Sequence, residues 1–123
     1  GVAALNHFEK KGINTAIGVD EAGINDDRDM LQELKLVLRA HRVPGMVEAD
    51  VPTMSQVLRM ATVGGAKTTP YGDSIGTLEV GKVADFVLWD VERPADLAYA
   101  IGFNPCRSVV RAGVTVTVTG QRA

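Results

Sequence analysis

The residues that could do chemistry in this chain centre on Asp20, which follows the short, mostly apolar stretch Gly12–Val19. This stretch predicts a β-strand buried on both faces, with Asp20 at its carboxyl end. In β/α proteins that end of the sheet forms the mouth of the active site. A carboxylate there can bind Zn²⁺ or Fe²⁺, or take a proton from a metal-bound water. The alternative is that Asp20 is a turn residue or caps the helix that follows.

The loop after Asp20 is rich in acidic residues. Asn25 and Asp26 lie nearest the presumed mouth, where they could orient the loop, and we predict a substrate contact for Asn25. Glu21 adds to the acidity of the loop, and for Asp27 and Asp29 helix capping and a solvated surface are the favoured explanation.

The other reactive side chains show no catalytic pattern. His7 and His41 lie far apart on predicted helices, without Cys or acidic partners at ligand spacing, so we expect surface or helix-end roles. Cys106 follows Pro105 in a predicted turn and lacks a paired histidine, so we expect it to be inert. No Gly-x-x-x-x-Gly-Lys phosphate loop is present.

Three helices are expected before residue 70. The first occupies Val2–Lys11 and ends at Gly12. The second starts near Asp26 or Asp27 and continues to about Ala40, because apolar residues recur there at helical spacing. The third starts at the N-cap Thr53 and ends or kinks at the glycine pair 64–65.

After residue 70 the pattern becomes that of a β structure. A turn-rich hairpin entry is expected over Ile75–Gly81, and the strongest strand over Ala84–Val91. A short helix is expected within Pro94–Ile101. One or two further strands are predicted within Ser108–Val118, around the turn at Ala112-Gly113.

Composition limits the possible partners. The 123 residues make at most one domain, with 13 basic and 15 acidic residues and a net charge of −2. Without a basic stripe we expect no nucleic-acid partner, and the short apolar runs predict no membrane span. A single cysteine is typical of a cytoplasmic protein. The chain begins at Gly1 and enters a helix almost at once, so we expect a fragment that associates with further copies of itself through exposed apolar surface.

Two motifs resemble the metal-dependent amidohydrolase superfamily, with the cytosine deaminase and triazine chlorohydrolase branch as the closest match. The segment Gly12–Asp20, with Asn25-Asp26 and Asp29-Met30, is similar to that branch's last barrel strand. Residues Ala61–Ala66 and Ile75–Asp90 are similar to its Ala-Thr-x-Gly-Ala and Ile-Gly-x-Leu-Glu-x-Gly-Lys-x-Ala-Asp signatures. Glu21 and Val19 depart from the Gly and Thr that are common in this branch.

The resemblance implies a fold class and a domain division. Residues 1–70 would form the last strand and helices of a (β/α)₈ barrel of the TIM type. Residues 71–123 would form the C-terminal part of a small β-sandwich. Lys82 and Asp85 belong to the structural signature and would not be catalytic.

The resemblance also implies a site. Asp20 matches the aspartate that binds the catalytic metal, Zn or Fe, and shuttles protons. The family's histidine ligands and acid–base glutamate have no counterpart here, so the chain alone should be inactive. The parent would hydrolyse C–N or C–halogen bonds of a small heterocyclic substrate, as a deaminase does. The alternatives are an imidazolonepropionase-like cyclic-amide hydrolase and a non-catalytic β/α interaction domain.

Overall fold

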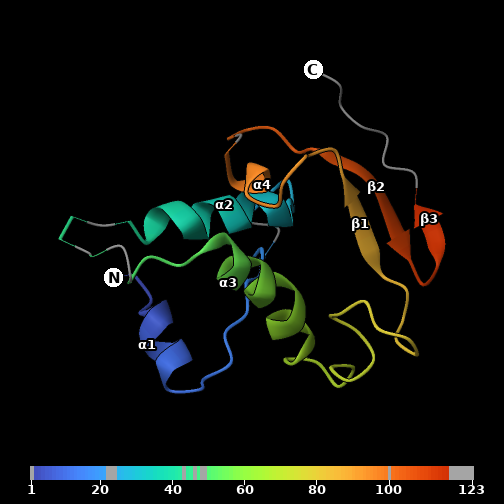
Figure 1. The fold of residues 1–123 in the computed structure, drawn as a ribbon, viewed down its shortest axis with the longest axis horizontal. Coiled ribbons are helices and arrows are strands. Elements are labelled where there is room, and N and C mark those ends of the chain that lie inside the picture. Colours follow the sequence, from blue (N-terminus) through green and yellow to red (C-terminus); the bar gives the residue numbers. More distant parts are fainter. Residues whose placement is uncertain are drawn as a thin grey trace.

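The computed structural model describes residues 2–21, 25–42, 44–45, 47, 50–99 and 101–116. Helices occupy its first part and a small sheet its last part, with one short helix between the first two strands (Figure 1). The elements run in the order α1 (Leu5–Lys10), α2 (Met30–Ala40), α3 (Met54–Arg59), η2 (Met60–Gly64), β1 (Phe86–Trp89), α4 (Asp96–Tyr99), β2 (Cys106–Arg111) and β3 (Val114–Val116).

Helix α1 ends at glycine, as predicted. The Gly12 amide donates to Glu9 O at 2.9 Å, and the Ile13 amide donates to Phe8 O at 2.9 Å. Gly12 has φ +70°, a conformation that glycine adopts without steric cost. These two bonds form a Schellman motif, which turns the chain into the extended segment that leads to Asp20.

Helix α2 starts later than predicted. Its N-cap is Asp29, whose side chain accepts from the Leu31 amide at 2.9 Å, so the predicted start near Asp26 or Asp27 is wrong. The reason is that Asp27 accepts hydrogen bonds from the Asp29 amide and the Gln32 side chain, which makes it part of the preceding turn. The predicted end near Ala40 is confirmed.

The core lies between α2, α3 and α4. Its buried members come from all three helices, and they are Leu31, Leu34, Leu38, Val57 and Leu97. Trp89 and Ile17 pack against this cluster while remaining partly exposed. Since α4 and Trp89 follow residue 70, the later part of the chain completes the core of the earlier part. The division at residue 70 remains a prediction.

Helix α3 begins with the predicted cap. The Thr53 side chain accepts from the Gln56 amide, and the Gln56 side chain accepts from the Thr53 amide, which is a capping box. The helix continues as a π-helical turn, η2, through Gly64. A Cβ added at Gly64 would lie 2.2 Å from Thr15 O, so only glycine allows the extended segment to approach this closely. The Asn14 side chain also donates to Gly64 O at 3.1 Å.

The predicted strand before Asp20 is not formed. Residues 13–20 are extended, but no ladder pairs them with any strand in the described part of the chain. The segment packs on helices through one side only: Thr15, Ile17 and Val19 are partly buried, whereas Gly18 and Asp20 are exposed. Burial on both faces is therefore also wrong for this structure. The residue pattern is that of a strand, but a strand is defined by partners, and the described residues provide none for this segment.

The sheet is a three-stranded antiparallel meander in the order β1-β2-β3, with Phe86 opposite Val110 and Val110 opposite Thr115. β1 and β3 lie inside the predicted ranges, whereas β2 starts at Cys106, two residues before the predicted start, so the predicted turn position of Cys106 is wrong because it pairs with Trp89. Residues 117–118 are outside the described part. The predicted hairpin entry over 75–81 contains turns and no strand.

The β2–β3 turn is the predicted Ala112-Gly113, and both residues have positive φ, at 49° and 78°. The Ala112 amide donates to Asp85 Oδ1 at 2.7 Å, and the Gly113 amide donates to Ala84 O at 2.9 Å. Lys82 bonds to the Thr77 hydroxyl at 2.6 Å. Residues of the Gly-Lys-x-Ala-Asp signature thus bond to Thr77, which precedes β1 in the chain, and to the β2–β3 turn, which follows it.

Helix α2 also buries a charged residue. Lys35 is 5% exposed, and its ammonium donates to Phe103 O. Burial lowers the pKa of Lys35, and the nearby Arg39 guanidinium adds to this effect, while the Asp29 carboxylate opposes it.

We predict that Gly64→Ala destabilises the fold, because the new methyl group would collide with the Thr15 carbonyl. Overpacking of this kind lowers the free energy of unfolding by about 1–3 kcal/mol. The matched control is Gly65→Ala, since Gly65 is helical and a Cβ there meets only Met60 O at 3.8 Å. That control should be neutral or stabilising by up to about 1 kcal/mol. Equal effects of the two variants in denaturant unfolding would contradict the close approach.

We predict that Lys35 makes stability depend on pH. Because its pKa is lowered on folding, the folded chain loses the proton at a lower pH than the unfolded chain. The unfolded chain then binds more protons, so stability rises with pH between the lowered value and the ordinary 10.5. The difference in unfolding free energy between wild type and Lys35→Met should therefore shift in favour of the wild type across this window. A difference that does not change with pH would refute the prediction.

Candidate active site

Asp20 ends the extended segment with an unusual backbone conformation. Its φ is +62°, which is uncommon outside glycine although Asp and Asn tolerate it better than other residues. The Glu21 amide donates to Asp20 Oδ1 at 3.0 Å. Asp20 is exposed. Strained backbone conformations of this kind are frequent at functional sites, so the conformation is in keeping with a functional role for Asp20.

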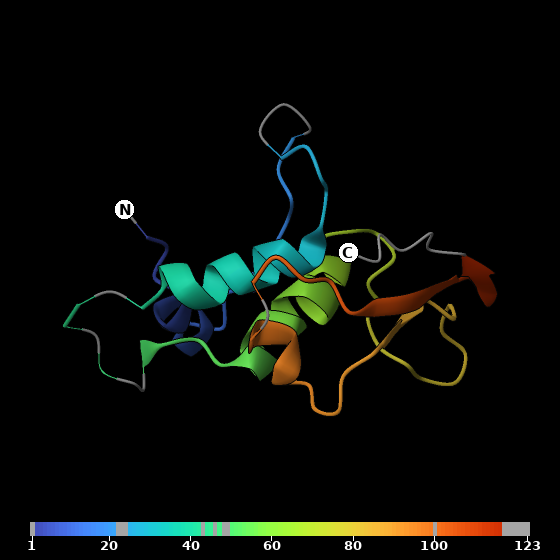
Figure 2. The same ribbon diagram turned by 90° about the horizontal axis from the view of Figure 1, so that it is seen from above.

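The residues on either side of the loop tip form two arms that project from the helical layer (Figure 2). Asn25 fixes the second arm. Its amide donates to Glu21 O at 3.0 Å, its Oδ1 accepts from the Arg28 amide at 3.1 Å, and its Nδ2 donates to the Glu33 carboxylate. Asn25, for which we predict a substrate contact, therefore also holds the loop in its conformation.

The acidic residues nearer α2 bond to backbone amides at the start of this helix, as expected. Asp27 and Asp29 accept backbone amides, and Asp29 Oδ2 also accepts from the Asn104 side chain at 2.8 Å. Asp26 is exposed. The bond between Asn104 and Asp29 is not predicted from the sequence, because the two residues lie 75 positions apart.

The histidines and the cysteine lie away from Asp20 in the chain and have other surroundings. His41 stands at the C-cap of α2, only 8% exposed, with ring nitrogens bonded to Val37 O and Ala3 O. The helix-end role is confirmed, but the surface position is wrong for this residue. His7 is exposed and meets Phe8 edge to face. Burial raises the pKa of the Cys106 thiol, and the Asp29 carboxylate adds to this effect, which lowers its reactivity.

The described residues do not build a metal site by themselves. Within the described ranges, no group of three or more His, Cys, Asp and Glu side chains lies close enough to hold an ion. A catalytic zinc needs three protein ligands, and no such group surrounds Asp20 in this part of the chain. Among the helices that the structure describes, none is long and apolar enough to cross a membrane.

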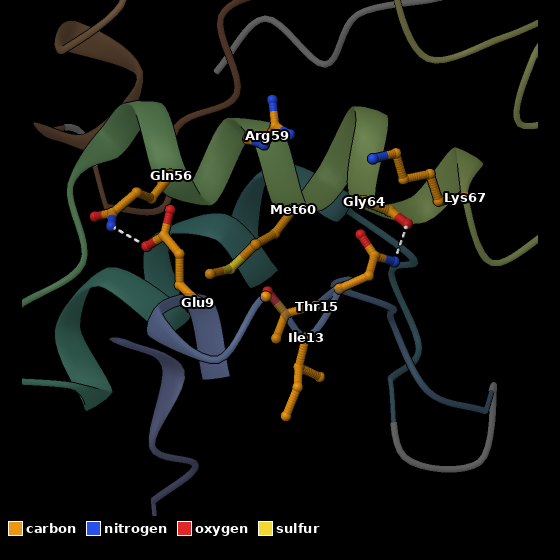
Figure 3. A pocket seen from close by; sticks show the side chains of 10 residues that line it. Glu9, Ile13, Thr15, Gln56, Arg59, Met60, Gly64 and Lys67 are labelled. Atoms are coloured by element: carbon orange, nitrogen blue, oxygen red, sulfur yellow. Dashed lines mark hydrogen bonds between the residues drawn. The ribbon is translucent and has the colours of Figure 1, made fainter. Parts of the chain in front are cut away.

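A pocket of about 220 Å³ opens at the other end of the extended segment (Figure 3). It lies between α1, α3 and residues 12–15, and Met60 points into the space between them. Glu9 and Gln56 are hydrogen-bonded across it. Asp20 and Asn25 do not line this pocket, so it is separate from the candidate site.

The sequence is similar to those of several known proteins. The pattern of the Amidohydrolase family matches residues 1–118. A 5-methylthioadenosine/S-adenosylhomocysteine deaminase of Desulforudis audaxviator is 35% identical over 131 residues, which cover 99% of this chain and 30% of that protein. An imidazolonepropionase of Shewanella baltica is 47% identical over 64 residues, covering 52% of this chain and 16% of that protein.

Solved structures agree with the sequence comparison. A mutant atrazine chlorohydrolase from Arthrobacter aurescens, complexed with zinc and atraton, superposes with a TM-score of 0.83 at 28% identity, over 94% of this chain and 27% of that one. A zinc-bound adenosine deaminase from Xanthomonas campestris gives 0.79 at 32% identity, over 94% of this chain and 28% of that one.

The chain thus spans about 30% of the length of the curated deaminase that it matches. The family pattern covers nearly all of the chain, and the predicted resemblance is confirmed. This chain belongs to the Amidohydrolase family.

Proposed function

We propose that the protein carrying this chain is a metal-dependent hydrolase of small nitrogen heterocycles, most simply a deaminase. Water would replace an amino group, or a halogen, on an electrophilic ring carbon, with ammonia or halide leaving. The single observation that carries this proposal is Asp20, an exposed carboxylate held at positive φ where the extended segment ends. Deaminase and chlorohydrolase relatives support it.

We propose the corresponding architecture. Residues 1–70 form the last strand and helices of a (β/α)₈ barrel, and residues 71–123 form part of a β-sandwich. The extended segment supports this, because its alternating burial is that of a strand with one face on helices and its other face open. Its missing strand partners would come from other parts of the protein.

Asp20 would act as one metal ligand and as a proton acceptor. When bound, a divalent metal, zinc or iron, supplies a water that loses a proton near neutral pH. Zinc in the solved relatives supports the first choice. Since the described residues bring no group of three or more potential ligands together, the remaining ligands would lie elsewhere in the protein, and this chain alone would be inactive.

Asn25 would contact the substrate through the hydrogen-bonding groups of its side chain that its protein partners do not use. A carboxamide has two acceptor lone pairs and two N–H groups. Arg28 uses one acceptor position and Glu33 uses one N–H. The described residues therefore leave one N–H and one lone pair for a heterocycle, whose ring nitrogens and exocyclic amine need such partners.

Two substrate classes are favoured by specific observations. Similarity over nearly the whole chain favours an aminated purine nucleoside, as in the deaminase relative. Higher local identity, 47% over 64 residues, favours an imidazolone ring, as in imidazolonepropionase. Assaying both classes with the full-length protein separates them. Turnover of neither class, with no metal bound, would favour a non-catalytic interaction domain.

We predict that Asp20→Asn and Asp20→Ala in the full-length protein abolish turnover, by at least about 100-fold, and reduce the metal content. Removing a charged ligand weakens metal binding, and Asn keeps the size while losing the negative charge. Activity assays and metal analysis measure the two effects.

Asp73→Asn is the matched control for these variants. Asp73 is an exposed carboxylate in the turns that precede β1, away in sequence from the proposed site. We expect it to keep wild-type turnover and metal content. Retention of both properties by the Asp20 variants as well would refute the assignment of Asp20.

A further inference from the structure

Helix α4 and the chain that follows it lie against α2 (Figure 2). Polar side chains of α2 bond to both of them. Lys35 donates to Phe103 O, and Arg39 Nη2 donates to Ala98 O at 3.0 Å. These bonds hold the middle and the end of α2. The third fastening is at the helix start, where Asn104 Nδ2 donates to Asp29 Oδ2 at 2.8 Å.

Asn104 uses both ends of its carboxamide. While Nδ2 bonds to Asp29, Oδ1 accepts from the Cys106 amide at 3.0 Å, at the first residue of β2. The partner carboxylate is equally engaged, because its Oδ1 accepts from the Leu31 amide. The planar amide and the planar carboxylate therefore join the start of the sheet strand to the N-cap of α2.

A chain of hydrogen bonds continues from this N-cap region to the candidate site. The Arg28 amide, next to Asp29, donates to Asn25 Oδ1. Asn25 bonds back to Glu33 in α2 and, through its own amide, to Glu21 O. Glu21 in turn donates to Asp20 Oδ1. Each step is a direct contact, so a displacement of the α2 start reaches both candidate site residues.

We propose that Asn104 is a positioning residue, which holds the start of α2 so that Asn25 and Asp20 keep their places. This proposal rests on the proposed function for its effect on catalysis, while the structural coupling itself does not. The competing explanation is that Asn104 only stabilises the helix cap, in which case its loss would lower the melting temperature and leave the loop unchanged.

A pair of substitutions distinguishes the two explanations. Asn104→Asp keeps an oxygen for the Cys106 amide, but it removes the donor and sets two carboxylates against each other. The double variant Asn104→Asp with Asp29→Asn exchanges the partners. In it residue 29 donates to residue 104, while its side-chain oxygen still accepts from the Leu31 amide. Every hydrogen bond of the link is thereby restored.

We predict that Asn104→Asp in the full-length protein speeds hydrogen exchange of the Leu31 and Asn25 amides by roughly tenfold, because local opening becomes easier. The Gly113 amide, which bonds to Ala84 O in the sheet, is the internal control and should not change. The exchanged double variant should return both affected amides to wild-type rates. Faster exchange at Leu31 with an unchanged rate at Asn25, or failure of the double variant to restore either, would overturn the proposal.

The same variants are assayed for turnover at a temperature where all are folded. Misplacement of a reacting group costs roughly 10- to 100-fold, so kcat should fall on Asn104→Asp and recover in the double variant. Unchanged kcat with loosened loop amides would overturn the catalytic part of the proposal. A wild-type protein without hydrolase activity would refute the proposed function instead, and the exchange rates would still decide the coupling.

Discussion

The carbonyl oxygen of Thr15 lies against Gly64 so closely that no side chain could stand between them. This contact seats the extended segment on the α3–η2 helix, and the Asn14 bond to the Gly64 carbonyl strengthens it. With the segment seated, Ile17 reaches the core formed by α2, α3 and α4. Asp20 follows three residues later and is exposed.

The loop after Asp20 is held by a different means. Residues 25–29 are held by hydrogen bonds at the start of α2. Asp27, Asp29 and Asn25 each accept backbone amides there. The helix is fixed from the other side by Lys35, Arg39 and Asn104. A buried helix that is tied on two sides makes a rigid base for a polar loop, which suits a site that must keep its geometry.

Local signals in the sequence predicted the local structure well. Gly12 and Thr53 were identified as helix-end residues because glycine tolerates positive φ and threonine accepts the N3 amide, and both act in this way. The turn at Ala112-Gly113 was equally local. The start of α2 was misplaced because several acidic residues could cap it, and only their competition selects Asp29.

What depends on distant partners could not be predicted. The segment before Asp20 has the residues of a strand, but a ladder needs partner strands, and none pairs with it in the part of the chain that the structure describes. The burial of Lys35 and His41 depends on carbonyl groups far along the chain. The bond between Asn104 and Asp29 joins residues 75 positions apart, so no local signal in the sequence predicts it. The sequence predicts only one corner of the candidate site, Asp20 with Asn25, and the described ranges bring no group of three or more potential metal ligands together.

The central claim is that Asp20 is one ligand of a metal held by the whole protein. A crystal structure of the full-length protein with zinc, with the ion located by its anomalous scattering, tests this claim most directly. The account predicts a carboxylate oxygen of Asp20 at about 2.0–2.2 Å from the ion. An ion bound by other residues, with the Asp20 carboxylate outside its coordination sphere, would contradict it.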